Sequence, residues 1–583
     1  GNLGSRDVGD RVRIAGWVAT RRDHGGVIFI DIRDASGIVQ AVINPDDAPD
    51  LGVAAHELRS EFCVSVAGTV RQRPDGTVNP DLPSGEIEIA VDHLKVLSPA
   101  EPLPFRIDQR SGVDELRRLE YRYLDLRRPE MAANLRARAA AVRAMRYTLD
   151  EAGFLDVETP TLIKTTPEGA RDFVVPSRLR RGKVYALPQS PQLFKQLLMI
   201  AGVERYYQIA RCYRDEDFRA DRQVEFTQLD VEGAFWGRDE VFDAIEAAVC
   251  ASVEAVRGTA PERPFPRLTW ADAMARYGSD KPDVRFGMEI TDVGDVFAGT
   301  GFKAFAGVLA GGGSIRAVNA GILGLSRTGL DGLVKAAQQY GAKGLVWLVV
   351  EDDGTLRSPV AKFLSGDELA SLVNRLDAGP GDVLLVVADE ERVAGGVLGR
   401  LRLDLGRPEG HDALAFLWVT DFPVFETTAD GKLAPAHHPF TAPVDVTDLV
   451  ENPAGAVSQA YDLVLNGSEL GSGSVRIHDP AVQSEVFDVL GIDPAEAESR
   501  FGWFLQALRF GTPPHAGFAV GIDRLVSILR REDNIREVMP FPKTQTGLDP
   551  MTGAPSRMDE AQLAELGLRL TDEALAELED PGD

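Results

Sequence analysis

The chain has 583 residues, of which 44% are hydrophobic and 26% are charged. This is the composition of an ordinary folded protein, so it excludes extensive disorder, and the length predicts about three or four domains. The net charge of -27 excludes a protein that coats nucleic acid by bulk attraction, so any nucleic acid partner must meet local basic and aromatic surface.

The cysteines also restrict the class of protein. Cys63, Cys212 and Cys250 are far apart and show no C-x-x-C spacing. They therefore support neither a disulfide framework nor a zinc ribbon, and they predict a reducing, cytoplasmic location. There is no apolar run of about 18 residues and no charged-then-apolar leader, so we expect neither a membrane span nor a secretion signal.

The N-terminal part of the chain predicts a barrel of short strands. Five alternating segments lie between Arg11 and about Leu97, with Gly, Pro and Asp turns between them. Five short strands are typical of a closed β-barrel of the OB type. Aromatic, basic and amide side chains on such strands suit stacking on unpaired bases and hydrogen bonding to them. The candidates are Arg22, Phe29 and Gln40, and a core position is the alternative for Phe29.

Beyond the barrel, longer helices and strands alternate. An Ala- and Arg-rich helix is predicted from about Met131 to Ala152, and the strand FLDVETPTL follows with Pro160 near its end. From about Thr291 to Gly406 the pattern changes to short α/β segments, which indicates an inserted domain. We therefore expect a multidomain α+β fold. Its expected parts are a barrel at 1–103, a hinge at 104–130, one domain in two parts at 131–285 and 411–545, an α/β insertion at 286–410 and a C-terminal extension at 546–583.

A long antiparallel hairpin is predicted between Tyr206 and Glu232, with the charged loop DEDFRADRQ at its tip. The guanidinium of Arg214 can bind a phosphate or a carboxylate through two hydrogen bonds. Glu216 and Gln223 can bind a nucleobase or an amino group, and a solvated hairpin tip is the alternative. Gln228 and Asp230 share one face at period two, which indicates a lined pocket.

A strand that turns into a helix is predicted at GTPPHAGFAVGIDRLVSIL, residues 511–529. The turn falls at Gly521, and the first helical turn carries Arg524. Glycines allow close approach of a ligand, and helix N-termini favour anions, so Arg524 could oppose a triphosphate. Taken alone, the motif is weak and favours a structural turn.

Two carboxylates seven residues apart, Asp462 and Glu469, lie on a predicted extended stretch that continues to Arg476. Carboxylates at this spacing can hold magnesium beside phosphates, because hard cations take oxygen ligands and share them with substrate. A surface carboxylate pair is the alternative interpretation.

Polar residues beside apolar neighbours mark two further segments. Glu168 lies in TTPEGARDFVV, and Gln192 and Lys195 lie in ALPQSPQLFKQLLM. Lys195 is near the start of a predicted helix, where a cation is unfavourable unless an anion lies beside it, so its position favours a functional role. His437 and His438 lie in PAHHPFTAP without a third ligand at a suitable spacing, so a substrate-contacting loop is preferred over a zinc site.

Three segments resemble, in chain order, motifs 1, 2 and 3 of class II aminoacyl-tRNA synthetases. They are the helix and strand that end at Pro160, the hairpin with Arg214 and the turn GIDR with Arg524. Within that class, the chain resembles the aspartyl enzymes of bacterial type, and the resemblance extends over nearly its whole length. The segments that carry it are TPEGARDF, SPQLFKQ, CYRDEDFRADRQVEFTQLD, HHPF and NGSELGSGSVRIH. The resemblance implies an antiparallel catalytic sheet, an anticodon-reading OB-fold, ATP and Mg²⁺, and a homodimer with Pro160 at its interface.

The resemblance also assigns roles to residues of this sequence. It implies catalytic roles for Arg214, Arg524 and Glu469, magnesium binding by Asp462 and Glu469, and anticodon contacts by Arg22, Phe29 and Gln40. ATP is expected to contact Arg214, Asp215, Glu216, Gln223, Glu469, Gly521, Ile522, Asp523 and Arg524. The aspartate pocket is expected to contain Glu168, Ser190, Gln192, Lys195, Arg214, Gln228, Asp230, His437 and Arg476.

The implied reaction forms aspartyl-adenylate from aspartate and ATP and then transfers aspartate to the terminal ribose of tRNA. Positioning and charge neutralisation by Arg214, Arg524 and magnesium would promote it without a protein nucleophile. Asparagine is expected to be rejected, because its neutral amide would leave Lys195 and Arg476 uncompensated.

Two residues bear on the choice of tRNA. Aspartyl enzymes that also charge tRNA(Asn) often carry His in the R-R-D-H-G-G loop and Gly in the R-x-R-P-x-G turn, and these positions are His24 and Gly76 here. A small Gly76 would leave room for either base at the third anticodon position. The chain is therefore predicted to charge tRNA(Asn) as well as tRNA(Asp).

Other functions remain open from the sequence. An asparaginyl enzyme is the nearest alternative, although it is not expected to keep Lys195, and a lysyl enzyme would place acids where Lys195 and Arg476 stand. A synthetase paralogue that binds RNA without catalysis is the alternative from a different class. The presence of every expected active-site residue argues against it.

Overall fold

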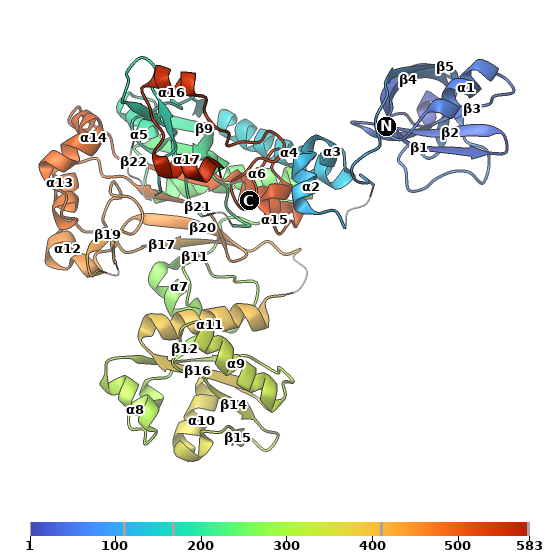
Figure 1. The fold of residues 1–583 in the computed structure, drawn as a ribbon. Coiled ribbons are helices and arrows are strands. Elements are labelled where there is room, and N and C mark those ends of the chain that lie inside the picture. The colour runs from blue at the N-terminus through green and yellow to red at the C-terminus, as the bar shows by residue number, and fades with distance from the viewer. Residues whose placement is uncertain are drawn as a thin grey trace. The chain divides into compact units, whose positions relative to one another are not determined.

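The computed structural model describes residues 2–108, 112–165, 170–217, 219–408, 412–428 and 430–579. The chain divides into two units, Gly1–Val113 and Asp114–Asp583, and each is described by itself (Figure 1).

The first unit is a closed five-stranded barrel, as predicted, with the strand order β1-β2-β3-β5-β4. Alternate residues of β2, Ile28, Ile30 and Ile32, fill its interior, because successive side chains of a strand point to opposite faces. A short helix that was not predicted, α1, lies between β3 and β4. The elements are β1 (Arg11–His24), β2 (Val27–Asp34), β3 (Gly37–Ile43), α1 (Pro49–Glu57), β4 (Cys63–Gln72) and β5 (Ile87–Ser98).

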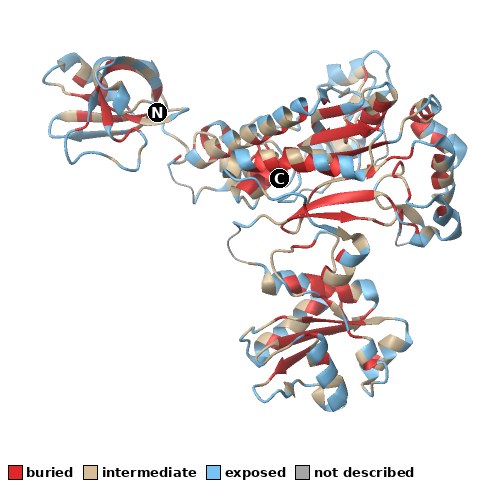
Figure 2. Cartoon of the chain, turned by 180° about the vertical axis from the view of Figure 1, so that it is seen from behind, coloured by how far each residue is buried: buried red, intermediate tan, exposed pale blue. Residues whose placement is uncertain are grey.

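The second unit is built on an eight-stranded, mainly antiparallel sheet with the order β11-β17-β20-β21-β22-β10-β9-β6. One face packs against α4, α6 and α15 around a core that includes Leu229, Val231 and Phe518 (Figure 2). Alternation places the polar residues of the same strands on the other face. The elements are α4 (Pro129–Glu151), β6 (Leu155–Asp156), β9 (Arg205–Tyr213), β10 (Glu225–Ala234), α6 (Arg238–Arg257), β11 (Arg267–Thr269), β17 (Phe416–Thr420), β20 (Ala460–Leu465), β21 (Ser468–Val475), β22 (His515–Gly521) and α15 (Ile522–Arg530).

Three of the predicted local structures are confirmed and one is shorter than expected. The hairpin is β9 paired with β10, the turn at Gly521 joins β22 to α15, and α4 begins with Pro129 as its first residue. The predicted strand at FLDVETPTL is limited to the two residues of β6. Because β6 is the outermost strand of the sheet, only β9 is available to pair with it.

The inserted segment forms a separate five-stranded sheet with the order β12-β13-β16-β14-β15. Apolar side chains of α9 and α11 cover one face and those of α8 and α10 the other. The elements are β12 (Thr291–Asp292), α8 (Lys303–Ala310), β13 (Ser314–Asn319), α9 (Arg327–Gln339), β14 (Val346–Val350), β15 (Leu356–Arg357), α10 (Gly366–Arg375), β16 (Val383–Asp389) and α11 (Glu391–Gly406).

The remaining elements of the second unit are helices and two small hairpins, and part of the described C-terminal tail is helical. They are α2 (Glu115–Glu120), α3 (Arg122–Asp125), β7 (Val174–Pro176), β8 (Val184–Ala186), α5 (Gln192–Ile200), α7 (Trp270–Tyr277), β18 (Phe425–Thr427), β19 (Leu433–Pro435), α12 (Val446–Glu451), α13 (Pro480–Val489), α14 (Pro494–Leu508), α16 (Glu560–Leu566) and α17 (Asp572–Glu579).

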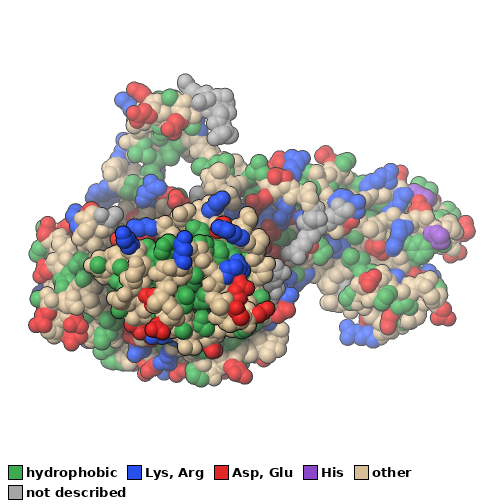
Figure 3. Space-filling model, turned by 90° about the horizontal axis from the view of Figure 1, so that it is seen from below, with side chains coloured by type: hydrophobic (Ala, Val, Ile, Leu, Met, Phe, Trp, Pro, Cys, Tyr) green, Lys and Arg blue, Asp and Glu red, His purple; other side chains and the backbone are tan. Residues whose placement is uncertain are grey.

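All three cysteines are free, and no helix in the described part of the chain is long and apolar enough to cross a membrane. On the face shown in Figure 3, acidic and basic side chains are interspersed. The negative net charge is therefore not concentrated in one field on that face.

Candidate active site

The candidate site lies on the face of the large sheet opposite the α4, α6 and α15 core. In the strand register, Asp230 of β10 opposes Ala519 of β22, Ala519 opposes Ser472 of β21, and Ser472 opposes Asp462 of β20. Directly opposed residues project from the same face. The sheet therefore brings Asp230 and Asp462 to one surface, with only small side chains between them.

A buried cluster of four charges occupies one end of this surface. Lys195 of α5 lies with its Nζ 2.9 Å from Oδ1 of Asp230 and 3.3 Å from Oε2 of Glu232. Arg476 donates from Nε to Oε1 of Glu232 at 2.9 Å and from Nη2 to Oε2 at 3.2 Å. The structure thus brings together three residues that the resemblance assigns to one pocket, Lys195, Asp230 and Arg476, and it joins them through Glu232, which was not singled out.

Glu232 is the residue of this charge cluster that sequence reasoning missed. It follows Gln228 and Asp230 at the same period of two, so continuing the alternation by one step would have identified it. Its side chain needs room, which Gly517 of β22 provides: a Cβ at that position would lie 1.8 Å from Oε2 of Glu232. Glycine at position 517 is therefore required by a close approach.

The charge cluster corrects one expectation. Lys195 and Arg476 were expected to lack compensation without a substrate carboxylate, but Asp230 and Glu232 already pair with them. Burial alone would raise the pKa of Glu232, yet Arg476 and Lys195 outweigh burial and hold that pKa below its usual value. Burial raises the pKa of Asp230, and Lys195 only partly opposes the rise. A substrate carboxylate would share these cations and would not be their sole partner.

Two buried polar atoms beside this cluster have no hydrogen-bond partner. They are Nε2 of Gln192, a donor, and Oδ2 of Asp230, an acceptor. Leaving such an atom unpaired costs about 1–3 kcal/mol, so a ligand that offers both an acceptor and a donor would be stabilised here. An amino acid, with its carboxylate and ammonium groups, has this combination.

The predicted ATP residues of the hairpin lie around its tip. Arg214 donates from Nε to the carbonyl of Gln189 at 3.4 Å, and its guanidinium lies 5.1 Å from the ring of Phe226. Gln223 is buried and exchanges two hydrogen bonds with the backbone of Lys543, at 3.2 and 2.9 Å. These contacts hold the loop that carries Arg214 against the sheet.

Four other predicted residues of the site have partners within the protein. Glu216 lies 3.2 Å from Arg222, the carboxylate of Asp215 lies 3.7 Å from Arg171, and Gln228 accepts from Cys212 at 3.2 Å. Ser190 accepts a hydrogen bond from the backbone N–H of Gln192 at 3.3 Å.

The turn at Gly521 presents Arg524 to the same region. The Arg524 guanidinium donates to the backbone carbonyl of Glu469 and lies 3.3 Å from Oδ2 of Asp221. Ile522 is fully buried in the core, and the carboxylate of Asp523 is buried between Arg138 and the backbone of Thr227. Of these three consecutive side chains, only that of Arg524 faces the candidate site.

The predicted metal carboxylates form an acidic group with a histidine. Burial raises the pKa of Asp462 to about 6; the carboxylates of Glu469 and Asp280 add to the rise, and His437 opposes it. His437 lies with Nε2 3.4 Å from Asp462, and although burial opposes protonation, this contact raises the pKa of the imidazole. Within the described residues, no group of three or more His, Cys, Asp or Glu side chains could hold a metal ion.

Two predicted residues lie apart from this surface or outside the described part. Pro160 is exposed just beyond β6, at the edge of the sheet. Glu168 lies outside the described residues.

In the barrel, the three predicted base-contacting residues share the outer face. Arg22 opposes Phe29 across β1 and β2, and Gln40 opposes Asp31 across β2 and β3, while Ile28 and Ile30 fill the interior. Phe29 is half-buried, so the core alternative does not hold for it. Arg22 is paired with Asp31 at 3.0 Å.

The predicted tRNA-discrimination residues lie in loops of the same barrel. His24 is exposed at the end of β1, and Gly76 lies in the β4–β5 loop with a φ of +79°, where a side chain would be strained. Sequence reasoning missed Arg73 in this loop. It is buried and donates to the carbonyl of Ile87 at 3.0 Å, and its Nη2 atom has no partner.

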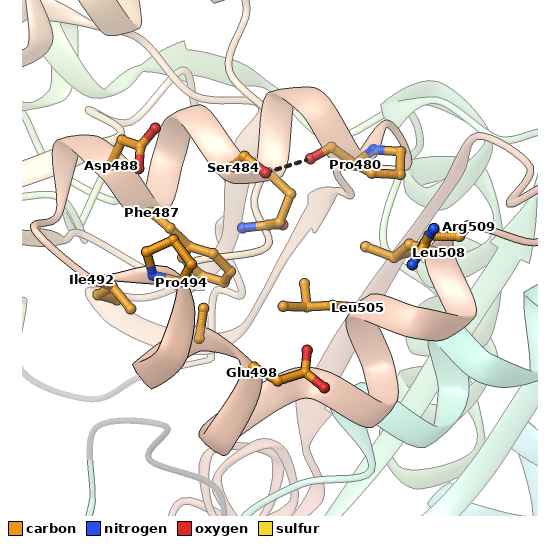
Figure 4. A pocket seen from close by; sticks show the side chains of 12 residues that line it. Pro480, Ser484, Phe487, Asp488, Ile492, Pro494, Glu498, Leu505, Leu508 and Arg509 are labelled. Carbon is orange, nitrogen blue, oxygen red and sulfur yellow. Dashed lines mark hydrogen bonds between the residues drawn. The ribbon is translucent and has the colours of Figure 1, made fainter.

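A pocket of about 240 Å³ lies away from these residues, between α13 and α14 (Figure 4). Phe487, Ile492, Leu505 and Leu508 contribute apolar lining, and Asp488 and Glu498 lie at its rim. None of the predicted site residues lines it. The candidate site is thus identified by the chemistry of the sheet surface and not by this pocket.

Comparisons with known proteins match both the barrel and the rest of the chain to described families. The family described as tRNA synthetases class II (D, K and N) matches residues 114–545, and the OB-fold nucleic acid binding domain matches residues 12–97. The aspartate–tRNA(Asp/Asn) ligase of Moorella thermoacetica is 52% identical over 98% of this chain and 96% of its own length. The enzyme of the same name from Rubrobacter xylanophilus is 53% identical over 98% of this chain and 96% of its own length.

Solved structures agree at the level of the fold. Asparaginyl-tRNA synthetase from Pyrococcus horikoshii covers 96% of this chain and 98% of its own, with a TM-score of 0.58 at 21% identity. Aspartyl tRNA synthetase from Entamoeba histolytica covers 92% of this chain and 89% of its own, with a TM-score of 0.56 at 20% identity. With an OB-fold barrel, an antiparallel sheet carrying the charge cluster and a family match over most of its length, the chain belongs to the class II tRNA synthetases of the D, K and N group.

Proposed function

We propose that the chain is an aspartate–tRNA ligase, which activates L-aspartate with ATP and transfers it to the 3′ end of tRNA(Asp). The observation that carries the proposal is the pair of unpartnered atoms, Nε2 of Gln192 and Oδ2 of Asp230, beside the cations Lys195 and Arg476. Gln192 would donate to the α-carboxylate and Asp230 would accept from the α-ammonium. The side-chain carboxylate would lie between Lys195 and Arg476. The names of relatives about half identical to the chain support the same substrate.

Activation would begin when an oxygen of the α-carboxylate of aspartate attacks the α-phosphorus of ATP. The bond from that phosphorus to the bridging oxygen of the β-phosphate breaks, and pyrophosphate leaves. Arg214, at the edge of the amino-acid pocket, would neutralise charge on the α-phosphate, and Arg524 would hold the γ-phosphate. In the second step the terminal ribose hydroxyl of tRNA attacks the carbonyl carbon, and AMP leaves.

The acidic group around Asp462 fits a divalent cation. Glu469 and Asp280 help to raise the pKa of Asp462, so the carboxylates repel one another and positive charge would relieve that repulsion. Asp462 and Glu469 would hold Mg²⁺, which when bound neutralises charge on the polyphosphate. His437, which contacts Asp462, would orient that carboxylate.

The exchange of pyrophosphate into ATP tests the proposal. We expect exchange with aspartate and none with asparagine or lysine. Exchange with asparagine alone would favour the asparaginyl alternative, and no exchange with any amino acid would favour an RNA-binding paralogue without catalysis.

We also propose that tRNA(Asn) is charged. His24 and Gly76 support this, as do the names of the relatives, which specify tRNA(Asp/Asn). Purified enzyme is expected to aspartylate both tRNAs at matched concentrations. A chain that charges tRNA(Asp) and leaves tRNA(Asn) uncharged contradicts this proposal without affecting aspartate activation.

The outer face of the barrel is proposed to bind the anticodon through Arg22, Phe29 and Gln40, with Arg73 as a further contact. Because stacking on one base contributes about 1–3 kcal/mol, Phe29→Ala is expected to raise the KM for tRNA roughly 10- to 100-fold. Pyrophosphate exchange needs no tRNA and should be unchanged.

The matched control for Phe29→Ala is Phe363→Ala, which removes an aromatic side chain of the inserted domain that is 52% exposed. It should leave both assays unchanged. An unchanged KM for tRNA in Phe29→Ala would remove this residue from the proposed interface.

We further propose a homodimer in which the exposed edge at β6 and Pro160 meets a second copy, and a cytoplasmic location. The division into barrel 1–103, hinge 104–130, catalytic parts 131–285 and 411–545, insertion 286–410 and extension 546–583 is retained as a proposal.

A further inference from the structure

Asp523 lies immediately before Arg524, but its side chain takes a different direction. The residue is only 3% exposed and belongs to the first turn of α15. Its Oδ1 atom pairs with the guanidinium of Arg138, which α4 contributes, and its Oδ2 atom accepts the backbone N–H of Thr227 in β10 at 2.8 Å. Both carboxylate oxygens are therefore occupied by protein groups from two other elements.

The bond to Thr227 extends the sheet beyond its last strand pair. The register of β10 and β22 ends where Gln228 opposes Gly521, because the chain turns into α15 at the next residue. The N–H of Thr227, one position further along β10, is met by the Asp523 carboxylate in place of a backbone carbonyl. A buried N–H without an acceptor would be costly, so Asp523 stabilises this end of the strand pair.

The bond to Arg138 joins the same carboxylate to α4. Arg138 is 17% exposed at its side chain and Asp523 is 5% exposed, so water screens the pair weakly. A carboxylate in the first turn of a helix also interacts favourably with the helix dipole. Asp523 thus joins α4, β10 and α15 at the point from which Arg524 projects.

We propose that Asp523 is a positioning residue that fixes the direction of Arg524, and that Arg138 acts through it. The proposal rests on the proposed function, in which Arg524 binds the γ-phosphate of ATP. This role differs from a direct contact between Asp523 and ATP. Positioning requires that loss of Arg138, on the far side of the carboxylate, weakens ATP binding as loss of the Asp523 carboxylate does. Aspartate binding, on β10 and α5, should depend on neither residue.

The variants Asp523→Asn and Arg138→Met remove the ion pair from either side. An asparagine can still accept the N–H of Thr227, so Asp523→Asn removes only the ion pair with Arg138. Asp523→Ala removes both the ion pair and the hydrogen bond from Thr227. Each single pair-breaking variant is expected to raise the KM for ATP roughly 10- to 100-fold, as for a misplaced binding group, with the KM for aspartate unchanged. Asp523→Ala should have the larger effect.

The double variant Arg138→Met with Asp523→Asn distinguishes positioning from direct binding. If the residues act as one unit, the double variant should be no worse than the more affected single variant. The proposal is overturned if Arg138→Met leaves the KM for ATP unchanged while Asp523→Asn raises it, or if the two effects multiply. Arg138→Lys retains a cation and should recover part of the ATP affinity.

Two measurements keep the test separate from folding and from the proposed function. Asp389→Asn is the matched control, since Asp389 is also buried, pairs with Lys343 and accepts backbone N–H groups, but lies in the inserted domain. It should leave the KM for ATP unchanged. The second measurement is ATP binding to the full chain by calorimetry without an amino acid. Affinity should fall in Asp523→Asn and Arg138→Met in parallel with the rise in the KM for ATP. Failure of the wild-type chain to exchange with aspartate would contradict the proposed function and not this inference.

Discussion

Replacing Lys195 with methionine is expected to impair aspartate activation severely and to destabilise the fold. Lys195 and Arg476 balance Asp230 and Glu232 in a buried cluster whose net charge is zero, so the variant leaves one uncompensated negative charge. Breaking a buried pair on one side costs about 3–5 kcal/mol in stability. The remaining carboxylates would also repel the side chain of aspartate. We expect kcat/KM for aspartate in pyrophosphate exchange to fall roughly 1000-fold.

The double variant Lys195→Met with Glu232→Gln tests the charge argument. It returns the cluster to neutrality, because Arg476 and Asp230 remain, so urea denaturation should show part of the lost stability restored. Lys343→Met is the control, since Lys343 also pairs with an aspartate but its side chain is 79% exposed. Because water screens this exposed ammonium, its loss should cost at most about 1 kcal/mol. Exchange by Lys195→Met within tenfold of the wild type would contradict the assignment of this pocket.

Replacing Arg214 with alanine is expected to reduce pyrophosphate exchange about 100- to 1000-fold, as when one group that stabilises transition-state charge is lost. The contacts of Arg214 with Gln189 and the Phe226 ring hold its guanidinium beside the proposed amino-acid pocket. Arg214→Lys keeps the charge but loses the two-pronged geometry that fits a carboxylate and a phosphate, so little activity should return.

The control for Arg214 is Arg211, which lies near the end of β9, shortly before Arg214 in the chain. Arg211 pairs with Glu225 at 2.6 Å and is 45% exposed at its side chain. Arg211→Ala should change exchange and stability only slightly. Equal losses in the two alanine variants would show that the hairpin needs cations for its fold and not for the reaction.

The local structures were predictable because neighbouring residues specify them. Period-two alternation and turn residues identified the barrel strands and the hairpin, and Gly521 marked the change from strand to helix. The resemblance to a known family then supplied roles for residues such as Arg214 and Lys195, which chemistry alone left open. The strand before Pro160 was predicted too long, since pairing depends on which strand lies beside it.

By itself, the sequence determined the family, the barrel, the hairpin and the candidate residues Lys195, Asp230 and Arg476. Only the tertiary structure decided how these charges are balanced. Lys195 and Asp230 are 35 positions apart, and Arg476 and Glu232 are 244 apart, so no local pattern relates them. The fold brings them together across a sheet and a helix. In the low-dielectric interior that results, each charge must find its partner within the protein or in the substrate.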